Sequence, residues 1–311
     1  EAGGITQTLK SYHLPIQQIK KISGNLIDLL GVQVTIPGIL FLDSPGHAAF
    51  NNLRKRGGNL ADIAILVIDI KEGFMPQTLE SIDILKSYRT PFLVALNKID
   101  SLSGWKTQTN IPLIKSIQSQ SEHTLKEIET KLYDIVAKFS ESGFSAERFD
   151  RVEDFTKQIS IVPCSAKTGQ GIPELLMVMT GLAQKFLEES LKIEIHGAAK
   201  GTVLEVKEER GVGKVLDVVL YDGSLKQGDT IGIGTLGKPF FTKVRGIFEE
   251  AGGKLKPQKE VSAACGAIIT APGLEHALAG MPLIVVKNNE EEVERLLKEE
   301  VEDVLIETDH K

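Results

Sequence analysis

The stretch Phe92-Leu93-Val94-Ala95-Leu96-Asn97-Lys98-Ile99-Asp100 decides the fold class of this chain of 311 residues. Its first five residues are all apolar, which is typical of a strand buried on both faces of a parallel sheet. An Asn-Lys-x-Asp sequence follows at once and therefore lies at the carboxyl end of that strand. Ligands bind at the carboxyl ends of the strands in doubly wound sheets. The stretch thus predicts a parallel sheet that carries a binding loop at residues 97–100.

Further apolar runs alternate with segments of helical spacing on both sides of this stretch. The runs are residues 39–43, 63–69 and 159–163, and the helical segments are about 46–60, 77–88, 121–140 and 172–189. Alternating strands and helices predict an α/β fold, with a doubly wound and mostly parallel sheet joined by right-handed crossovers. Pro173 stands near the first turn of the last helix, where its missing N–H costs little.

The pattern changes at about Ile193, where short strand-like stretches separated by turn residues begin. They are residues 201–206, 213–221, 229–234, 242–249, 266–270 and 283–287. Their close spacing and frequent glycines predict a small antiparallel β-barrel. Segment 290–306 then repeats apolar residues in one helical stripe, which predicts a helix packed on its own protein. The stripe consists of Val293, Leu296, Leu297, Val301, Val304 and Leu305.

Composition excludes several classes of protein. The chain is 41% hydrophobic and 25% charged, as in ordinary globular proteins, and its length allows two domains. No apolar run approaches the roughly 18 residues that cross a membrane, and two distant cysteines argue against a disulfide framework and for a reducing cytoplasm. The net charge of −6 comes from residues 288–311, with ten acidic and three basic side chains, so the remainder sums to +1. Overall charge therefore neither supports nor excludes an RNA partner.

The Asn97-Lys98-Ile99-Asp100 sequence suits the recognition of guanine. A carboxylate such as that of Asp100 accepts two hydrogen bonds, which guanine supplies from N1–H and its exocyclic amine and adenine does not. Asn97 and Lys98 would brace the loop and cover the base. An isolated Asn-Lys-x-Asp sequence is more often a surface turn, so its specificity depends on the other motifs.

A second motif, Asp43-Ser44-Pro45-Gly46-His47, begins at the last residue of the run 39–43 and precedes the expected helix. Asp43 is placed to hold a metal ion through water, and Gly46 offers an unobstructed backbone N–H to a γ-phosphate. His47 is placed to position an attacking water. Asp-x-x-Gly alone has a high false-positive rate, and an isolated histidine is more often structural.

Two more segments complete an ordered set. Ser165-Ala166-Lys167 follows the run 159–163, and its backbone N–H groups could bind guanine O6, although it is also a strand-to-helix turn. The hydroxyl of Thr6, in Gly3-Gly4-Ile5-Thr6, could ligate Mg²⁺ when a loop closes on nucleotide. The order Thr6, Asp43, Asn97, Ser165 resembles that of the GTPase superfamily.

The resemblance narrows to one branch and covers essentially the whole chain. Residues 1–7 (EAGGITQ), 43–47 (DSPGH), 52–57 (NLRKRG) and 61–69 (ADIAILVID) are similar to the universal initiation GTPase. That family comprises bacterial initiation factor two and archaeal and eukaryotic initiation factor five-B. Pro37-Gly38 and the long insertion between Asp100 and Ser165 favour the archaeal–eukaryotic type. Ser44 stands where the family usually has threonine.

This resemblance implies a GTP-binding domain at 1–192, the second-domain barrel of translation factors at 193–287 and an acidic linker helix at 288–311. It implies a cytoplasmic, monomeric GTPase that binds both ribosomal subunits, promotes their joining with initiator tRNA and leaves after hydrolysing GTP to GDP and phosphate. Thr6 and Asp43 would serve Mg²⁺, Gly46 the γ-phosphate and His47 the catalytic water. GTP or GDP would be bound by Asp43, Gly46, Asn97, Lys98, Asp100, Ser165, Ala166 and Lys167.

The chain departs from the family at the phosphate loop, since Gly-x-x-x-x-Gly-Lys-[Ser/Thr] does not occur in it. In the family that loop precedes the Gly-Gly-Ile-Thr segment, and the domains that contact initiator tRNA follow residue 311. Three accounts stay open: an incomplete copy with the loop encoded elsewhere, one piece of a split factor, or a degenerate GTPase kept as a nucleotide-independent ribosome-binding module. An elongation-type GTPase is a further alternative, which residues 3–7 and 52–57 disfavour.

Overall fold

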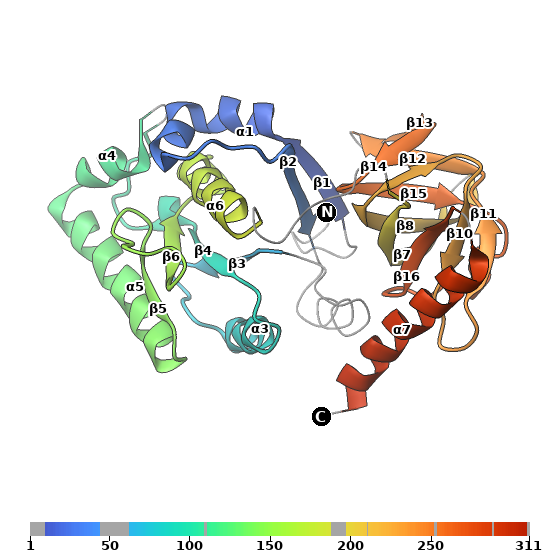
Figure 1. Cartoon of the computed structure of the whole chain (residues 1–311). Coiled ribbons are helices and arrows are strands. Elements are labelled where there is room, and N and C mark those ends of the chain that lie inside the picture. Colours follow the sequence, from blue (N-terminus) through green and yellow to red (C-terminus); the bar gives the residue numbers. More distant parts are fainter. Residues whose placement is uncertain are drawn as a thin grey trace. The chain divides into compact units, whose positions relative to one another are not determined.

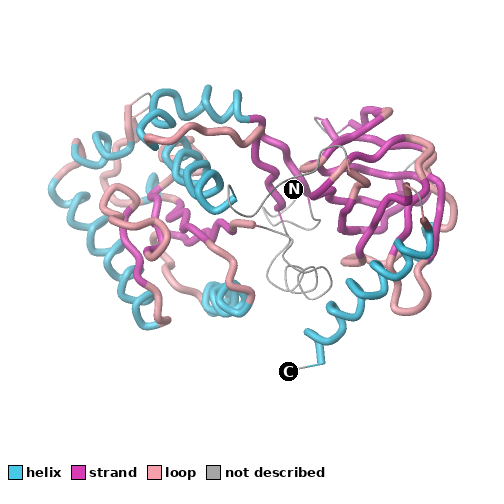
Figure 2. The backbone as a smooth tube through the Cα atoms, viewed as in Figure 1, coloured by secondary structure: helices cyan, strands magenta, loops and turns pink. Residues whose placement is uncertain are grey.

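The computed structural model describes residues 10–43, 62–108, 111–187, 197–209, 211–251, 254–287 and 289–309. The chain divides into two compact units. The α/β unit consists of Pro15–Gly38 and Ala61–Ser190, and the β-rich unit of Glu1–Leu14, Ile39–Leu60 and Leu191–Lys311. Figure 2 shows mixed helices and strands in the first unit and mainly strands in the second. The expected helix at 46–60, with Gly46 and His47, and Thr6 lie outside the described residues.

A four-stranded parallel sheet forms the centre of the α/β unit. Its order is β3-β4-β6-β5, and every neighbouring pair is parallel. The bounds are β3 Ala64–Asp69, β4 Phe92–Asn97, β5 Ser145–Arg148 and β6 Gln158–Pro163. Residues of β4 from Phe92 to Leu96 are buried, as their continuous apolar run predicts. The prediction of a parallel sheet is confirmed.

Helices pack around this sheet (Figure 1). They are α1 Ile16–Ser23, α3 Pro76–Ser87, α4 Leu113–Gln118, α5 Glu122–Glu141 and α6 Ile172–Leu187, with 3₁₀ segments η1 Gly24–Leu30 and η2 Ile99–Ser101. Ser121 caps α5 by accepting a hydrogen bond from the N–H of Thr124. The buried residues Ile128, Leu132 and Ile135 lie three or four positions apart, so one stripe of α5 faces the core. No helix among the described residues is long and apolar enough to cross a membrane.

The run at 39–43 forms a strand, as predicted, but not in the parallel sheet. It is β2, Gly38–Asp43, which pairs with β1, Lys10–Pro15, in a separate two-stranded sheet. Leu40 and Leu42 of β2 pack on Leu204 and Val219 of the β-rich unit. The apolar side chains of this run are therefore covered by barrel strands, and not by the helices of a doubly wound sheet.

The β-rich unit is built on an eight-stranded antiparallel sheet of order β11-β10-β16-β7-β8-β15-β12-β13, with β9 and β14 paired beside it. The bounds are β7 Lys200–Glu209, β8 Gly213–Asp222, β9 Ser224–Lys226, β10 Thr230–Ile233, β11 Phe240–Lys243, β12 Gly246–Ala251, β13 Lys254–Gln258, β14 Glu260–Ser262, β15 Cys265–Thr270 and β16 Pro282–Val286. A single hydrophobic cluster draws side chains from eight of these strands and fills the unit. The predicted antiparallel β-rich part is confirmed.

The expected strand at 242–249 is two strands, because the chain changes partners between them. β11 pairs with β10, whereas β12 pairs with β15. At the break, Val244 N–H donates to the Asp229 carbonyl and Arg245 N–H to the Thr270 carbonyl. Thr242 and Val244 are buried in alternation, whereas Ile247, three positions after Val244, is out of phase with them, so the side chain that faces the core changes phase at this break.

Helix α7, Glu290–Asp309, follows the sheet and confirms the predicted C-terminal helix. Val293 and Leu297 pack against Ile284 of β16, and Val301 is also buried. The side chains of Val304 and Leu305 lie outside the described part of the helix. Burying one such leucine side chain stabilises a fold by about 1.5–3 kcal/mol, so the stripe is enough to dock the helix.

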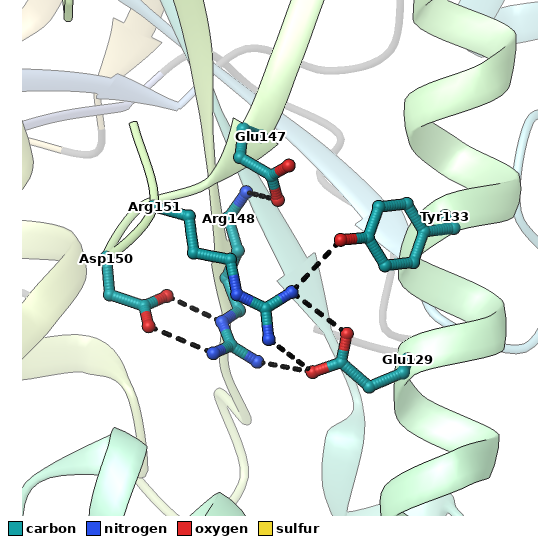
Figure 3. A network of polar contacts seen from close by, with 6 residues as sticks. All are labelled: Glu129, Tyr133, Glu147, Arg148, Asp150 and Arg151. Atoms are coloured by element: carbon teal, nitrogen blue, oxygen red, sulfur yellow. Dashed lines mark hydrogen bonds and ion pairs between the residues drawn. The ribbon is translucent and has the colours of Figure 1, made fainter. Parts of the chain in front are cut away.

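A network of charges joins α5 to the edge strand β5 (Figure 3). The Arg148 guanidinium donates from Nε and Nη2 to the two carboxylate oxygens of Asp150, at 2.5 and 2.9 Å, and from Nη1 to Glu129 at 2.8 Å. Arg151 donates twice to the same Glu129, at 2.8 and 3.0 Å, and once to the Tyr133 hydroxyl. Arg148 is only 6% exposed, so water does little to stabilise its charge. The carboxylates of Asp150 and Glu129 neutralise that charge within the fold.

Candidate guanine-nucleotide site

Three strands of the parallel sheet end side by side at one edge. Register pairs Asp69 at the end of β3 with Asn97 at the end of β4, and Leu96 of β4 with Pro163 at the end of β6. The predicted motif at 97–100 begins with the last residue of β4, and the motif at 165–167 begins two residues after the end of β6. The sheet therefore brings both predicted guanine segments to the same edge, where doubly wound folds bind ligands.

Asn97 fastens the two segments together. Its Oδ1 accepts hydrogen bonds from the backbone N–H of Lys98 at 2.8 Å and from that of Ala166 at 3.0 Å. A backbone bond from Ile99 N–H to the Cys164 carbonyl, 3.2 Å, adds a second connection. The asparagine side chain thus sets the distance between the two loops, which is the bracing that the sequence predicts for it.

The loop turns sharply at Lys98, which has φ 67° and ψ 32°. A non-glycine residue in the left-handed region costs roughly 1–2 kcal/mol. Ser101 offsets this cost, because its N–H and Oγ both donate to the Lys98 carbonyl, at 2.9 and 2.7 Å. The turn exposes the lysine side chain and leaves Asp100 half-buried at the edge of the sheet.

An ion pair that the sequence did not predict holds Lys98. Its Nζ lies 2.7 Å from Oδ2 of Asp69. The hydrogen bond to Asp69 and the attraction of that carboxylate raise the pKa of Lys98. Burial opposes ionisation of Asp69, but Lys98 and backbone N–H groups outweigh it and lower the pKa of this carboxyl. The signal for this pair in the sequence was the place of Asp69, which is the last residue of its apolar run.

The segment after β6 closes into a short loop. Ser165 N–H donates to the Gln170 carbonyl and Gly169 N–H to the Ser165 carbonyl, both at 2.8 Å. Ser165 Oγ, fully buried, accepts from Thr168 N–H at 3.1 Å. Gly171 has φ 79°, and an added Cβ would lie 2.2 Å from the Pro163 carbonyl oxygen, so only glycine fits. Ala166 and Lys167 stand exposed at the tip of this loop.

The arrangement is chemically suited to guanine. Asp100 supplies a carboxylate able to accept from two adjacent N–H groups, and the loop at 165–167 presents backbone N–H groups able to donate to a carbonyl oxygen. The hydrogen bonds that Asn97 and Ser165 accept from backbone N–H groups hold both loops in this arrangement. Adenine offers neither the pair of donors nor the carbonyl.

Of the predicted phosphate and magnesium residues, the structure describes only Asp43. Asp43 ends β2 in the β-rich unit, and Thr6, Gly46 and His47 lie outside the described residues. Within the ranges that the structure describes, no three His, Cys, Asp or Glu side chains gather as a metal site. The geometry therefore carries the guanine half of the predicted site.

The Elongation factor Tu GTP binding domain family matches residues 1–185 of the chain. The chain belongs to this family of translational GTPases. GTP hydrolysis is the reaction of the family. Its match spans the parallel sheet and both guanine segments, so the fold and the motifs lead to the same assignment.

Relatives of this translational GTPase are archaeal initiation factors. The chain is 52% identical over 319 residues to a probable translation initiation factor IF-2 of Methanopyrus kandleri, covering 99% of the chain and 53% of the relative. A factor of the same name from Thermococcus sibiricus is 49% identical, with the same coverage of both. The chain thus spans about half the length of these curated relatives.

A solved structure agrees with these relatives. The GDP-bound aIF5B of Aeropyrum pernix has a TM-score of 0.88 and 44% identity to the chain, covering 97% of the chain and 52% of that structure. The predicted resemblance to initiation factors of the archaeal–eukaryotic type is therefore confirmed, and the elongation-type alternative is not favoured.

Proposed function

We propose that this translational GTPase acts in initiation: it binds GTP and GDP, associates with both ribosomal subunits and promotes their joining with initiator tRNA. The observation that carries the proposal is the pair of guanine loops fastened by Asn97, in a chain about half identical to archaeal initiation factors. A degenerate site that no longer bound nucleotide would not need Asn97, Lys98 and Asp100 together. Contact with initiator tRNA is assigned to domains outside these residues, and the protein acts as a cytoplasmic monomer.

Each site residue has a proposed role. Asp100 accepts hydrogen bonds from guanine N1–H and the exocyclic amine. Asn97 and Lys98 brace the loop and cover the base. The backbone of Ser165, Ala166 and Lys167 binds O6. Thr6 and Asp43 hold Mg²⁺, which neutralises phosphate charge when it is bound, and Gly46 contacts the γ-phosphate. His47 positions the attacking water. The boundaries 1–192, 193–287 and 288–311 are proposed for the three parts.

The guanine assignment is tested by changing the donor–acceptor pattern at Asp100. Asp100→Ala should abolish any preference for GDP over ADP in competition binding. Asp100→Asn should transfer the preference to xanthosine diphosphate, because an amide N–H can donate to the xanthine 2-carbonyl that a carboxylate repels. An Asp100→Asn protein that still prefers GDP over xanthosine diphosphate would show that Asp100 does not read the base.

Phosphate binding by the 311-residue polypeptide is proposed to be weak. Its sequence lacks the glycine-rich loop, whose backbone N–H groups and lysine hold the β- and γ-phosphates. Calorimetric titration with GDP at micromolar protein should give a far higher Kd than for an intact relative. A submicromolar Kd would contradict this role of the loop.

Two experiments separate a GTPase from a nucleotide-independent ribosome-binding module. When the phosphate loop is supplied from a relative, His47→Ala should bind GTP like the parent and lose hydrolysis. Equal turnover would assign His47 a structural role. Co-sedimentation with ribosomes should depend on GTP, whereas equal pelleting with and without nucleotide would favour the binding module.

A further inference from the structure

The buried side chain of Gln170 is a junction between the guanine loop and the insertion that follows Asp100. Gln170 is 7% exposed. Its Oε1 accepts from Trp105 Nε1 at 3.1 Å, and its Nε2 donates to the Ser116 hydroxyl and, at 3.4 Å, to the Gln108 carbonyl. All three partners belong to the segment between η2 and the end of α4. The amide therefore bonds to the insertion and not to its own loop.

The backbone of the same residue closes the guanine loop. The Gln170 carbonyl accepts the N–H of Ser165 at 2.8 Å, across the turn that presents Ala166 and Lys167. Gln170 stands between Gly169 and Gly171, with φ 80° and 79°. Glycines restrict the backbone least, so local sequence alone would hold this closing residue poorly. The side-chain bonds of Gln170 supply the restraint.

We propose that Gln170 is a positioning residue for base recognition: the insertion, through Trp105 and Ser116, holds Gln170 and thereby aims the backbone N–H groups of residues 165–167 at guanine O6. The inference rests on the proposed function. It assigns the insertion a part in base specificity, acting on the O6 contact and not on the contacts made by Asp100.

Nucleotide analogues distinguish the two sets of contacts. In 6-thio-GDP a sulfur, which is a weaker acceptor, replaces O6, whereas inosine diphosphate lacks only the exocyclic amine that Asp100 reads. Ligand-observed NMR titrations tolerate the millimolar Kd values expected of this polypeptide. The parent protein should bind GDP about 5–10 times more tightly than 6-thio-GDP, as for one hydrogen bond.

Gln170→Leu should reduce this ratio to about twofold or less, as expected when one hydrogen bond is lost, and leave the ratio of GDP to inosine diphosphate as in the parent. Trp105→Phe keeps an aromatic ring in place and removes the indole N–H that Gln170 accepts, so it should fold normally and reduce the ratio partially. Hydrogen exchange of the Ser165 N–H should quicken in both variants because its acceptor is less restrained.

Gln120→Leu is a matched control. Gln120 is 6% exposed in the same insertion, and its side chain bonds to the backbone of Lys106 and Ser116 but not to the guanine loop. This variant should keep the parental ratio of GDP to 6-thio-GDP. Equal losses for all three nucleotides in Gln170→Leu and Trp105→Phe, or a parental ratio in both, would overturn the positioning role. A parent that does not prefer GDP over ADP would overturn the proposed function instead.

Discussion

Removing the buried guanidinium of Arg148 should destabilise the α/β unit strongly. Breaking a buried ion pair by deleting one partner costs about 3–5 kcal/mol. Here Glu129 keeps two hydrogen bonds from Arg151, and the side chain of Asp150 is 25% exposed, so water relieves part of the loss. For Arg148→Met, which keeps most of the packed volume, we therefore expect about 3 kcal/mol, at the lower end of that range.

Urea unfolding followed by tryptophan fluorescence measures this change in the right unit. Trp105 is the single tryptophan of the chain and lies in the α/β unit, as does Arg148. The loss of about 3 kcal/mol should lower the urea midpoint by about 1–3 M without changing the slope, since slopes are about 1–3 kcal/mol per molar urea. In a thermal melt the same loss lowers Tm by about 6–12 °C for a unit of this size.

Arg151→Met is the matched control for that experiment. The side chain of Arg151 is 37% exposed and shares the same Glu129. Exposed pairs contribute only about 0.2–1 kcal/mol, so this variant should unfold nearly like the parent. Equal shifts for Arg148→Met and Arg151→Met, or a shift below about 1 kcal/mol for the former, would refute the reasoning that burial decides the cost.

Three further outcomes are expected. Hydrogen bonds from the Thr156 hydroxyl and N–H lower the pKa of Asp154 to about 2 from 3.8. The stabilising contribution of Asp154 is therefore complete above about pH 3.8 and lost as pH falls through about 2. In Thr156→Val this pKa, measured by NMR titration, should move toward 3.8, and an unchanged value would contradict this cause. Burial raises the pKa of Cys164 and of Cys265 to about 12, so neither should react with a thiol reagent at pH 8 until urea unfolds its unit, and rapid reaction of the native protein would contradict their burial. Leu297 of α7 is fully buried against β16, so Leu297→Ala should cost about 2–5 kcal/mol, measured by circular dichroism as a lower melting temperature. An unchanged melting temperature would show that the helix does not depend on this stripe.

A local sequence pattern was sufficient to predict an element where that pattern is compatible with only one environment. The apolar run of β4 predicted a central strand because only a strand covered on both faces accommodates such a run. The spacing of α5 and α7 predicted their buried stripes for a similar reason. The Asn97–Asp100 segment could be placed at a strand end because it follows that run directly.

Other features were missed because they depend on partners from distant parts of the chain. Strand β5 carries Glu147 and Arg148, and its buried arginine is compensated by Glu129 from α5. Nothing within residues 145–148 indicates that Glu129 would neutralise the charge of Arg148. The split between β11 and β12, and the pairing of β2 with β1, likewise depend on which partner the backbone meets.

The sequence by itself determined the class of fold and the residues suited to guanine, beginning with the stretch at 92–100. Only the tertiary structure decided how those residues are held. Asn97 meets Ala166, Lys98 meets Asp69, and Gln170 meets Trp105 through contacts between segments far apart in the chain. Periodicity and motif spacing describe what one segment prefers, whereas hydrogen bonds between loops depend on the sheet register that brings strand ends together.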